Sequence, residues 1–383
     1  MSNKLSRVQV QAFRGLRNVL MEDIRRVNLI VGPNNTGKTS LLESLFFLCD
    51  PVNPKRFETL ALNRRGSGTG GTFYDLLKYL FPRDPGGFET EIHICATVES
   101  PHSEIHAFAR AIQRIELGNG QTEDVNESDS STILEVLLGI EPRASVGSTN
   151  SARQTTSFDV RAIGKVRTKP NKTKNAISCV WVKPTLQSME MFAVSALSNL
   201  PDLESRKTII QMLQEFDEGV MDYEIVSPSG GESIIRIWHK QTGPMPLSTF
   251  GDGFRRVVTY AGALVKAKDG VLLIDEIETA IHFSALGKVY KWLVESCERL
   301  NVQLIATTHS LEALDAILTA HNTGKNIVEP VPENEFEPLE LPPKGTADLA
   351  VYRLRREGPT VKVQRLSGES AWDIRYGGGL ELR

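Results

Sequence analysis

The fold is decided by residues 27–49, which read VNLIVGPNNTGKTSLLESLFFLC. Apolar residues dominate 27–31, and a short apolar run bounded by turn formers is typical of a buried strand. Glycine, proline and two asparagines then turn the chain, and residues 40–49 have the apolar character of a packed helix. The pattern from Gly32 to Thr39 is a complete G-x-x-x-x-G-K-T. A strand before this pattern and a helix after it are the context of a phosphate-binding loop.

Each part of this loop has a chemical use. Its glycines allow backbone N–H groups to point inward at phosphate oxygens, and the N-terminus of the helix adds a favourable dipole. Lys38 would bridge the β- and γ-phosphates of ATP, and the Thr39 hydroxyl would bind Mg²⁺. The sequence therefore predicts ATP and Mg²⁺ at a site formed by Asn34, Asn35, Thr36, Gly37, Lys38, Thr39 and Ser40.

A second apolar run, residues 271–274, ends in two acids, Asp275 and Glu276. Acids at the carboxyl end of a parallel strand lie at the ligand crevice of an α/β sheet. Asp275 is suited to hold Mg²⁺, and Glu276 to orient or deprotonate the attacking water. Capping of the next helix is the alternative role for these acids, but together with the phosphate loop the pair indicates a Walker B strand.

His309 follows a third apolar run, residues 304–308. An imidazole at the end of that strand would donate a hydrogen bond to the γ-phosphate, whereas a lone histidine is more often structural.

Residues 247–253, here called the signature segment, directly precede a predicted helix over 254–266. Its Ser248, Gly251, Asp252 and Gly253 stand at a helix N-terminus and form a possible second anion-binding corner. A helix cap after a glycine turn is the alternative interpretation. One nucleotide does not need two such corners in one chain.

The remaining pattern predicts an α/β protein. Strands and helices alternate from residue 251 to 307, which favours a parallel sheet with crossover helices. We divide the chain into an N-terminal lobe with the phosphate loop (1–115), a polar insertion with mobile loops and a basic second half (116–184), a segment with helices, signature, Walker B strand and His309 (185–325), and a linker with C-terminal strands (326–383).

Composition narrows the class of protein. The 383 residues are 40% hydrophobic and carry a net charge of −3, which excludes a largely disordered chain and a global basic field. Nucleic acid would have to be met by a local patch, for which the basic half of 116–184 is the candidate; solvated loops are the alternative. Four widely spaced cysteines match no metal motif or disulfide framework, and no apolar run is long enough to cross a membrane. We therefore expect a cytoplasmic protein.

The order of these motifs resembles that of the ABC-type ATPase heads of the SMC, RecF and OLD group. The resemblance rests on Phe13-Arg14-Gly15, the Walker A loop, the Ser-x-Phe-Gly-Asp-Gly signature, the Walker B strand with an appended Glu, and His309. The chain is most similar to the small stand-alone OLD-like ATPases of bacterial anti-phage systems, such as the ATPase subunit of PARIS. The resemblance implies an ABC-type head: a mixed or parallel sheet with a P-loop core plus antiparallel β and helical subdomains.

The resemblance also implies an assembly. In such heads the signature of one protomer completes the ATP site of another, so a homodimer or a higher homo-oligomer is expected. Arg14 would reach the nucleotide or make a surface ion pair instead. OLD proteins of full length carry a TOPRIM nuclease, for which the residues after His309 leave no room, so such an effector would be a separate chain.

Three functions therefore compete. The first is an ATP-hydrolysing sensor or scaffold in anti-phage defence, which holds a separate effector until nucleic acid or a phage protein triggers release. The second is a DNA-repair or DNA-remodelling ATPase similar to RecF and SMC. The third is the nucleotide-binding subunit of a transporter, which the Phe-Arg-Gly start and the Gly-Asp-Gly signature argue against.

Overall fold

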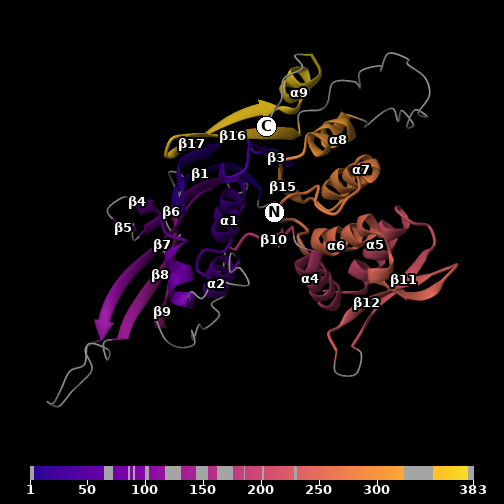
Figure 1. Ribbon diagram of the computed structural model, residues 1–383, viewed down its shortest axis with the longest axis horizontal. Coiled ribbons are helices and arrows are strands. Elements are labelled where there is room, and N and C mark those ends of the chain that lie inside the picture. Colours follow the sequence, from indigo (N-terminus) through magenta and orange to yellow (C-terminus); the bar gives the residue numbers. More distant parts are fainter. Residues whose placement is uncertain are drawn as a thin grey trace.

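Helix α1 (Lys38–Leu48), which follows the phosphate loop, lies between two β-sheets (Figure 1). The computed structural model describes residues 4–63, 72–84, 87–88, 91–99, 103–116, 131–143, 154–161, 176–184, 186–200, 202–227, 231–322 and 348–377. Its α/β class, with a parallel sheet around the phosphate loop and added antiparallel and helical parts, confirms the predicted fold class.

The central sheet has six strands in the order β10-β14-β15-β3-β16-β17. All neighbours are parallel except the edge pair β16 and β17. The bounds of these strands are β3 Val27–Val31, β10 Cys179–Val182, β14 Val271–Ile274, β15 Gln303–Thr308, β16 Leu349–Glu357 and β17 Thr360–Ser367. In the register, Val31 lies beside Thr308 and Ile274 beside Ala306. The carboxyl ends of β3, β15 and β14 therefore meet at one edge.

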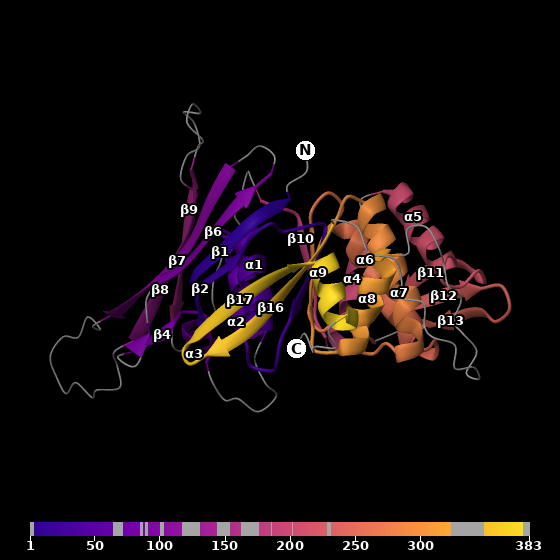
Figure 2. The ribbon, with the colours of Figure 1, turned by 90° about the horizontal axis from the view of Figure 1, so that it is seen from above.

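The second sheet is antiparallel, with the order β2-β1-β6-β7-β8-β9. Its strands are β1 Leu5–Phe13, β2 Leu16–Met21, β6 Glu91–Val98, β7 Ser103–Glu116, β8 Ser131–Arg143 and β9 Gln154–Arg161. Figure 2 shows this sheet on one side of α1 and the helices of the other half of the chain on the opposite side. Apolar side chains of β1, α1 and the near face of the central sheet form one core.

Strands β8, β9 and β10 fall within 116–184, where the sequence predicted a polar insertion with mobile loops. Leu134, Val136 and Leu138 are fully buried at every second position of β8, which is the period of a half-buried strand. Polar residues are frequent around this alternation, so the composition of the segment did not predict a strand. The expected basic patch lies mostly outside the described residues, which exclude Arg153, Lys165, Arg167, Lys169, Lys172 and Lys174.

Helices cover the other face of the central sheet and enclose a second core. Here α6 (Asp252–Lys266), α7 (Phe283–Arg299) and α8 (Leu311–Asn322) pack with α4 (Leu186–Ser198) and α5 (Leu203–Gln214). The smaller elements are α2 Pro54–Leu62, α3 Phe73–Lys78, β4 Arg83–Asp84, β5 Gly87–Phe88, β11 Val220–Val226, β12 Ile234–His239, β13 Gly243–Pro246, the 3₁₀ turn η1 Leu247–Thr249, α9 Gly368–Trp372 and the π-helical turn η2 Asp373–Gly377.

Segment 185–325 begins with two helices, α4 and α5, and the antiparallel pair β11 and β12 follows them. The four cysteines are free thiols. Residues 326–343, at the start of the predicted linker with C-terminal strands, lie outside the described residues. Within the described ranges, no helix combines the length and the apolar character needed to span a membrane.

Candidate functional site

The phosphate loop has a backbone that only its glycines can adopt. Gly32 has φ 148°, and a Cβ added there would lie 2.5 Å from the main-chain oxygen of Leu354. Gly37, which precedes α1, has φ 95° in the left-handed region. The Thr36 hydroxyl donates to the Pro33 carbonyl at 2.8 Å and ties the loop to itself. The loop is therefore shaped by its own chain before any ligand binds.

Lys38 folds back over this loop. Its Nζ donates to the carbonyl of Gly32 at 2.6 Å and to that of Pro33 at 2.9 Å. Burial lowers the pKa of the ammonium, and the carboxylates of Asp275, Glu278 and Glu276 oppose that shift. A buried cation held only by carbonyls is well placed to accept a phosphate anion.

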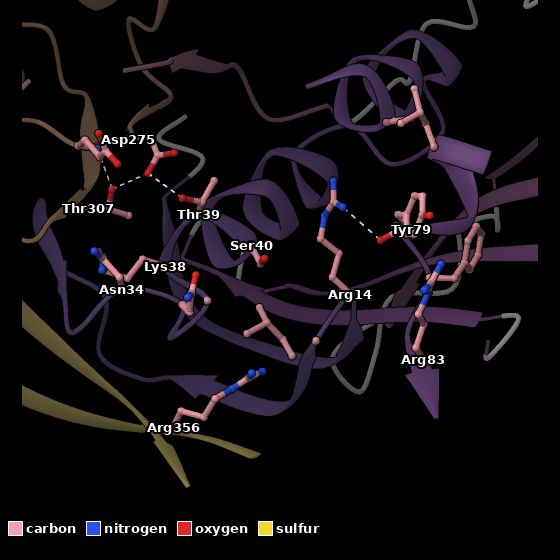
Figure 3. A pocket seen from close by; sticks show the side chains of 18 of the residues that line it. Arg14, Asn34, Lys38, Thr39, Ser40, Tyr79, Arg83, Asp275, Thr307 and Arg356 are labelled. Atoms are coloured by element: carbon pink, nitrogen blue, oxygen red, sulfur yellow. Dashed lines mark hydrogen bonds between the residues drawn. The ribbon is translucent and has the colours of Figure 1, made fainter. Parts of the chain in front are cut away.

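Thr39 and Asp275 meet across the edge of the central sheet (Figure 3). The Thr39 hydroxyl donates to Asp275 Oδ1 at 3.2 Å, and the Thr307 hydroxyl donates to the same oxygen at 2.6 Å. Burial raises the pKa of the Asp275 carboxyl, although both hydrogen bonds oppose the shift. The carboxylate thus occupies a site that disfavours its charge.

These oxygens suit Mg²⁺, which prefers hard oxygen ligands and usually takes only one or two from protein. Across the described part of the chain, no cluster of three or more His, Cys, Asp or Glu side chains is positioned to hold a metal by itself. An ion between Thr39 and Asp275 would therefore need oxygens from a nucleotide and from water. Such an ion would also offset the buried charge of Asp275.

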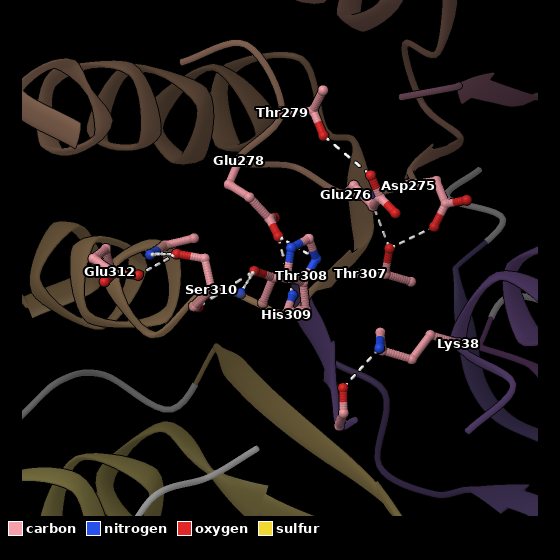
Figure 4. A network of polar contacts seen from close by, with 12 residues as sticks. Lys38, Asp275, Glu276, Glu278, Thr279, Thr307, Thr308, His309, Ser310 and Glu312 are labelled. Carbon is pink, nitrogen blue, oxygen red and sulfur yellow. Dashed lines mark hydrogen bonds and ion pairs between the residues drawn. The ribbon is translucent and has the colours of Figure 1, made fainter. Parts of the chain in front are cut away.

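Glu276 is held in an uncommon backbone conformation, with φ 50°. Its N–H donates to the Thr307 hydroxyl at 2.8 Å, and the Thr279 hydroxyl donates to its Oε2 at 3.2 Å (Figure 4). The half-buried side chain lines the same cavity as Lys38. A carboxylate in that place can accept a proton from a water molecule next to a bound phosphate.

His309 follows β15 and is oriented by Glu278. Its Nδ1 lies 2.9 Å from Glu278 Oε1, and its backbone N–H donates to the same oxygen at 3.0 Å. The histidine side chain is 51% exposed, whereas that of Glu278 is only 12% exposed. The imidazole is therefore held at the rim of the cavity, accessible to a ligand.

A cavity of about 1420 Å³ joins these groups. Of the residues predicted from the sequence, it is lined by Arg14, Asn34, Asn35, Gly37, Lys38, Thr39, Ser40, Asp275, Glu276 and His309. Thr36 lies in the loop but does not line the cavity. Sequence reasoning missed Thr307 and Glu278. Thr307 comes from the strand beside Asp275, and Glu278 follows that acid by three residues, but only the tertiary fold gives either a partner.

Arg14 lines the cavity, but its guanidinium contacts residues outside the phosphate loop. Its Nε lies 2.7 Å from Glu43 Oε2, and its Nη atoms donate to the carbonyls of Tyr79 and Leu60 at 3.1 Å. The Glu43 side chain is fully buried, so the pair is an internal one and not the surface ion pair considered from the sequence. The group ties the end of β1 to α1, to α2 and to the residue that follows α3.

The signature segment lies apart from this cavity. Gly251 caps the N-terminus of α6, and apart from the adjoining residues and the backbone of the helix itself no described atom lies within 4 Å of a Cβ built on Gly251 or Gly253. Ser248 lines a different cavity of about 370 Å³, between α4 and β12. Asp252 is paired with Arg255 at 2.7 Å. Within one chain the structure therefore does not bring the two predicted anion-binding corners together.

Comparison with known proteins places these features in a family. The family model described as "AAA domain, putative AbiEii toxin, Type IV TA system" matches residues 27–315. An ATP/GTP phosphatase of Helicobacter pylori is 23% identical over 350 residues, which cover 82% of this chain and 90% of that protein.

Two further similarities are more limited. The "Uncharacterized protein MJECL11" of Methanocaldococcus jannaschii is 40% identical over 133 residues, which cover 35% of this chain and 98% of that protein. A crystal structure of the SmcHead bound to the C-winged helix domain of ScpA aligns with 97% of this chain and 99% of its own, at 12% identity and a TM-score of 0.48.

The buried charge of Asp275 leads to a prediction for Asp275→Asn. The pKa of this carboxyl is higher in the folded chain than the unfolded value of about 3.9, so ionisation at neutral pH costs stability. Without nucleotide and Mg²⁺, the variant should melt about 2 °C above wild type at pH 7. That advantage should shrink as the pH falls.

The same variant should lose the tightening of ATP binding by Mg²⁺. Calorimetric melting and ATP titrations with and without Mg²⁺ measure both effects. Glu298→Gln, on the exposed side of α7, is the control and should change neither. An Asp275→Asn protein that melts like wild type and keeps its Mg²⁺ dependence would contradict the assignment.

Proposed function

The chain belongs to the AAA-domain family whose model it matches over residues 27–315, and on that premise we propose that it is an ABC-type ATPase that hydrolyses Mg²⁺-bound ATP in the large cavity. One observation carries the proposal. Lys38 and Thr39, which follow β3 through the phosphate loop, line a single cavity with Asp275 and Glu276, which follow β14 at the same edge of the central sheet.

Each residue has a role that its position supports. Lys38 binds the β- and γ-phosphates once it leaves the loop carbonyls that it now contacts. Thr39 and Asp275 hold Mg²⁺, which offsets phosphate charge when bound. Glu276 accepts the proton of the attacking water, and His309, oriented by Glu278, donates a hydrogen bond to the γ-phosphate.

Two substitutions separate binding from hydrolysis. Lys38→Ala should abolish ATP binding, because the cation that meets the phosphates is lost. Glu276→Gln should bind ATP like wild type but hydrolyse it about 100- to 10,000-fold more slowly, because the general base is lost. Equilibrium ATP binding and steady-state phosphate release measure the two effects. Normal turnover of Glu276→Gln would show that another group activates the water.

We further infer that two copies close over ATP with opposed sites. The signature segment lies apart from the cavity of its own chain, and the N-terminus of α6 has open space in which an anion could bind. This arrangement supports the dimer, because the anion would then come from the nucleotide of another copy. In the closed pair, Ser248 and Gly251 of one copy would contact the γ-phosphate bound by Lys38 of the other. Higher homo-oligomers would build on this dimer.

Sedimentation of Glu276→Gln tests the dimer. The variant should be monomeric without nucleotide and dimeric with ATP and Mg²⁺, because slow hydrolysis preserves the bound state. Adding Ser248→Glu should prevent the shift by placing negative charge against the phosphates. Gln241→Glu, an exposed position in the turn between β12 and β13, is the matched control. Equal sedimentation with and without ATP would overturn the opposed-site arrangement.

For biological role we propose a sensor or scaffold in anti-phage defence that holds a separate effector, such as a TOPRIM-type nuclease, and releases it on a trigger. The motif order supports this role, and the family description names a toxin of type IV toxin–antitoxin systems. The trigger would be nucleic acid or a phage protein.

Co-expression with the adjacent open reading frame tests this role. The neighbour should co-purify with the Glu276→Gln variant in ATP, and it should encode a nuclease or another toxic effector. Lys38→Ala is the control, since a complex that depends on the nucleotide state should be weakened by it. If the neighbour is unrelated and does not co-purify, the proposed role is wrong.

A further inference from the structure

Arg256 lies buried in α6, the helix that follows the signature segment, and reaches the backbone of Glu276. Only 1% of this residue is exposed. Its Nη2 donates to the carbonyl oxygen of Glu276 at 3.1 Å, and its Nε donates to the Tyr260 hydroxyl at 2.7 Å. The Tyr260 hydroxyl in turn donates to the carbonyl of Ile277 at 3.1 Å. Through Arg256 and Tyr260, helix α6 thus contacts two successive carbonyls, those of Glu276 and Ile277, in the turn that follows the Walker B strand. This turn is called the Walker B turn below.

These contacts meet the chain at a residue whose backbone conformation is unfavourable. Glu276 has φ 50°, and a residue with a Cβ adopts that left-handed conformation only at a cost that its surroundings must offset. Thr307 accepts the Glu276 N–H on one side, and Arg256 donates to its carbonyl on the other. The direction of the Glu276 side chain follows from this fixed peptide.

The surroundings of Arg256 stabilise its buried positive charge. The guanidinium carbon lies 5.0 Å from the centre of the Tyr260 ring, so the charge is shielded by an aromatic face as well as by hydrogen bonds. The Tyr260 hydroxyl is protonated at neutral pH and can donate, and burial raises its pKa further. A buried arginine is costly unless its donors have acceptors, and here the Glu276 carbonyl and the Tyr260 hydroxyl accept from the guanidinium.

We propose that Arg256 is a positioning residue, which fixes the carboxylate of Glu276 for attack by water and links that carboxylate to the signature helix. The inference rests on the proposed function, in which Glu276 is the general base. Helix α6 begins at the signature segment, and Arg256, one helical turn further along, contacts the Glu276 carbonyl. Any shift of the helix would therefore move the general base. Contact between the signature and a nucleotide on another copy would then be transmitted to the chain's own site.

The neighbouring Arg255 shows that the contact belongs to one position of the helix. It pairs with Glu190 of α4 and with Asp252 at the start of α6, on the side of the signature segment. The two consecutive arginines of α6 therefore have different contacts. Arg255 lies beside the signature segment, and Arg256 contacts the Walker B turn.

The test is a double-mutant comparison with ATP as the substrate. Arg256→Met keeps much of the apolar stem and removes the donors. It should bind ATP with wild-type affinity, since the phosphate loop is untouched, and lower kcat about 100-fold, the usual effect of a small misplacement of a catalytic group. In the Glu276→Gln background, Arg256→Met should lower kcat by less than about threefold, because residues that act through one another are not additive.

Two further variants keep the outcome interpretable. Arg256→Lys retains a cationic donor group on a single nitrogen and should recover part of kcat. Tyr260→Phe is nearly isosteric and leaves the direct bond to Glu276, so it should lower kcat less than Arg256→Met does and serves if Arg256→Met does not fold. Arg375→Met is the control, since that arginine makes two 2.9 Å contacts with Asp315 away from the cavity and should leave kcat unchanged.

The result that overturns the inference is distinct from the failure of the proposed function. If Glu276→Gln blocks hydrolysis while Arg256→Met and Tyr260→Phe turn over normally, Arg256 does not position the base. Full additivity of Arg256→Met with Glu276→Gln, or a loss of ATP affinity equal to the loss of kcat, would also overturn it. If Glu276→Gln itself turns over normally, the proposed function fails instead.

Discussion

The parallel pairing of β3, β15 and β14 is the constraint on which the site depends. Parallel strands must all end at the same edge, and the register places Val31 beside Thr308 and Ile274 beside Ala306. The phosphate loop therefore meets Thr307 and the two acids that follow β14, although more than two hundred residues separate it from them. Crossover helices α1 and α7 make this pairing possible and at the same time cover the two faces of the sheet.

The same edge concentrates charge that the fold alone does not stabilise. Burial disfavours both the Lys38 ammonium and the Asp275 carboxylate, and each is held by neutral hydrogen-bonding groups in place of an ionic partner. In the proposed function, a ligand with phosphate anions and a divalent cation would supply an ionic partner to each. The free energy of binding such a ligand would then come partly from relieving a cost that the free protein carries.

The sequence was sufficient for elements whose signal is local and insufficient for those that depend on partners. The strand, loop and helix around Gly32–Thr39 and the acids after Ile274 follow from short patterns, and the structure has them there. Thr307, Glu278 and Arg256 gain their roles only from contacts with distant residues, so no spacing reveals them. The strands within segment 116–184 were not predicted, because polar residues mask the alternation of β8. The internal Arg14–Glu43 pair likewise needed the tertiary fold.

Strand β16 has a consequence for the order in which the molecule matures. It pairs with β3 from residue 349 onward, and the Leu354 carbonyl packs against Gly32 of the phosphate loop. During synthesis, the ribosome releases this strand only after nearly all other elements have emerged. Until then β3 lacks one neighbour and the loop lacks one wall. A nascent chain that already contains the phosphate loop and both acids thus still lacks one wall of the pocket, and a product truncated before β16 would present an open sheet edge to chaperones.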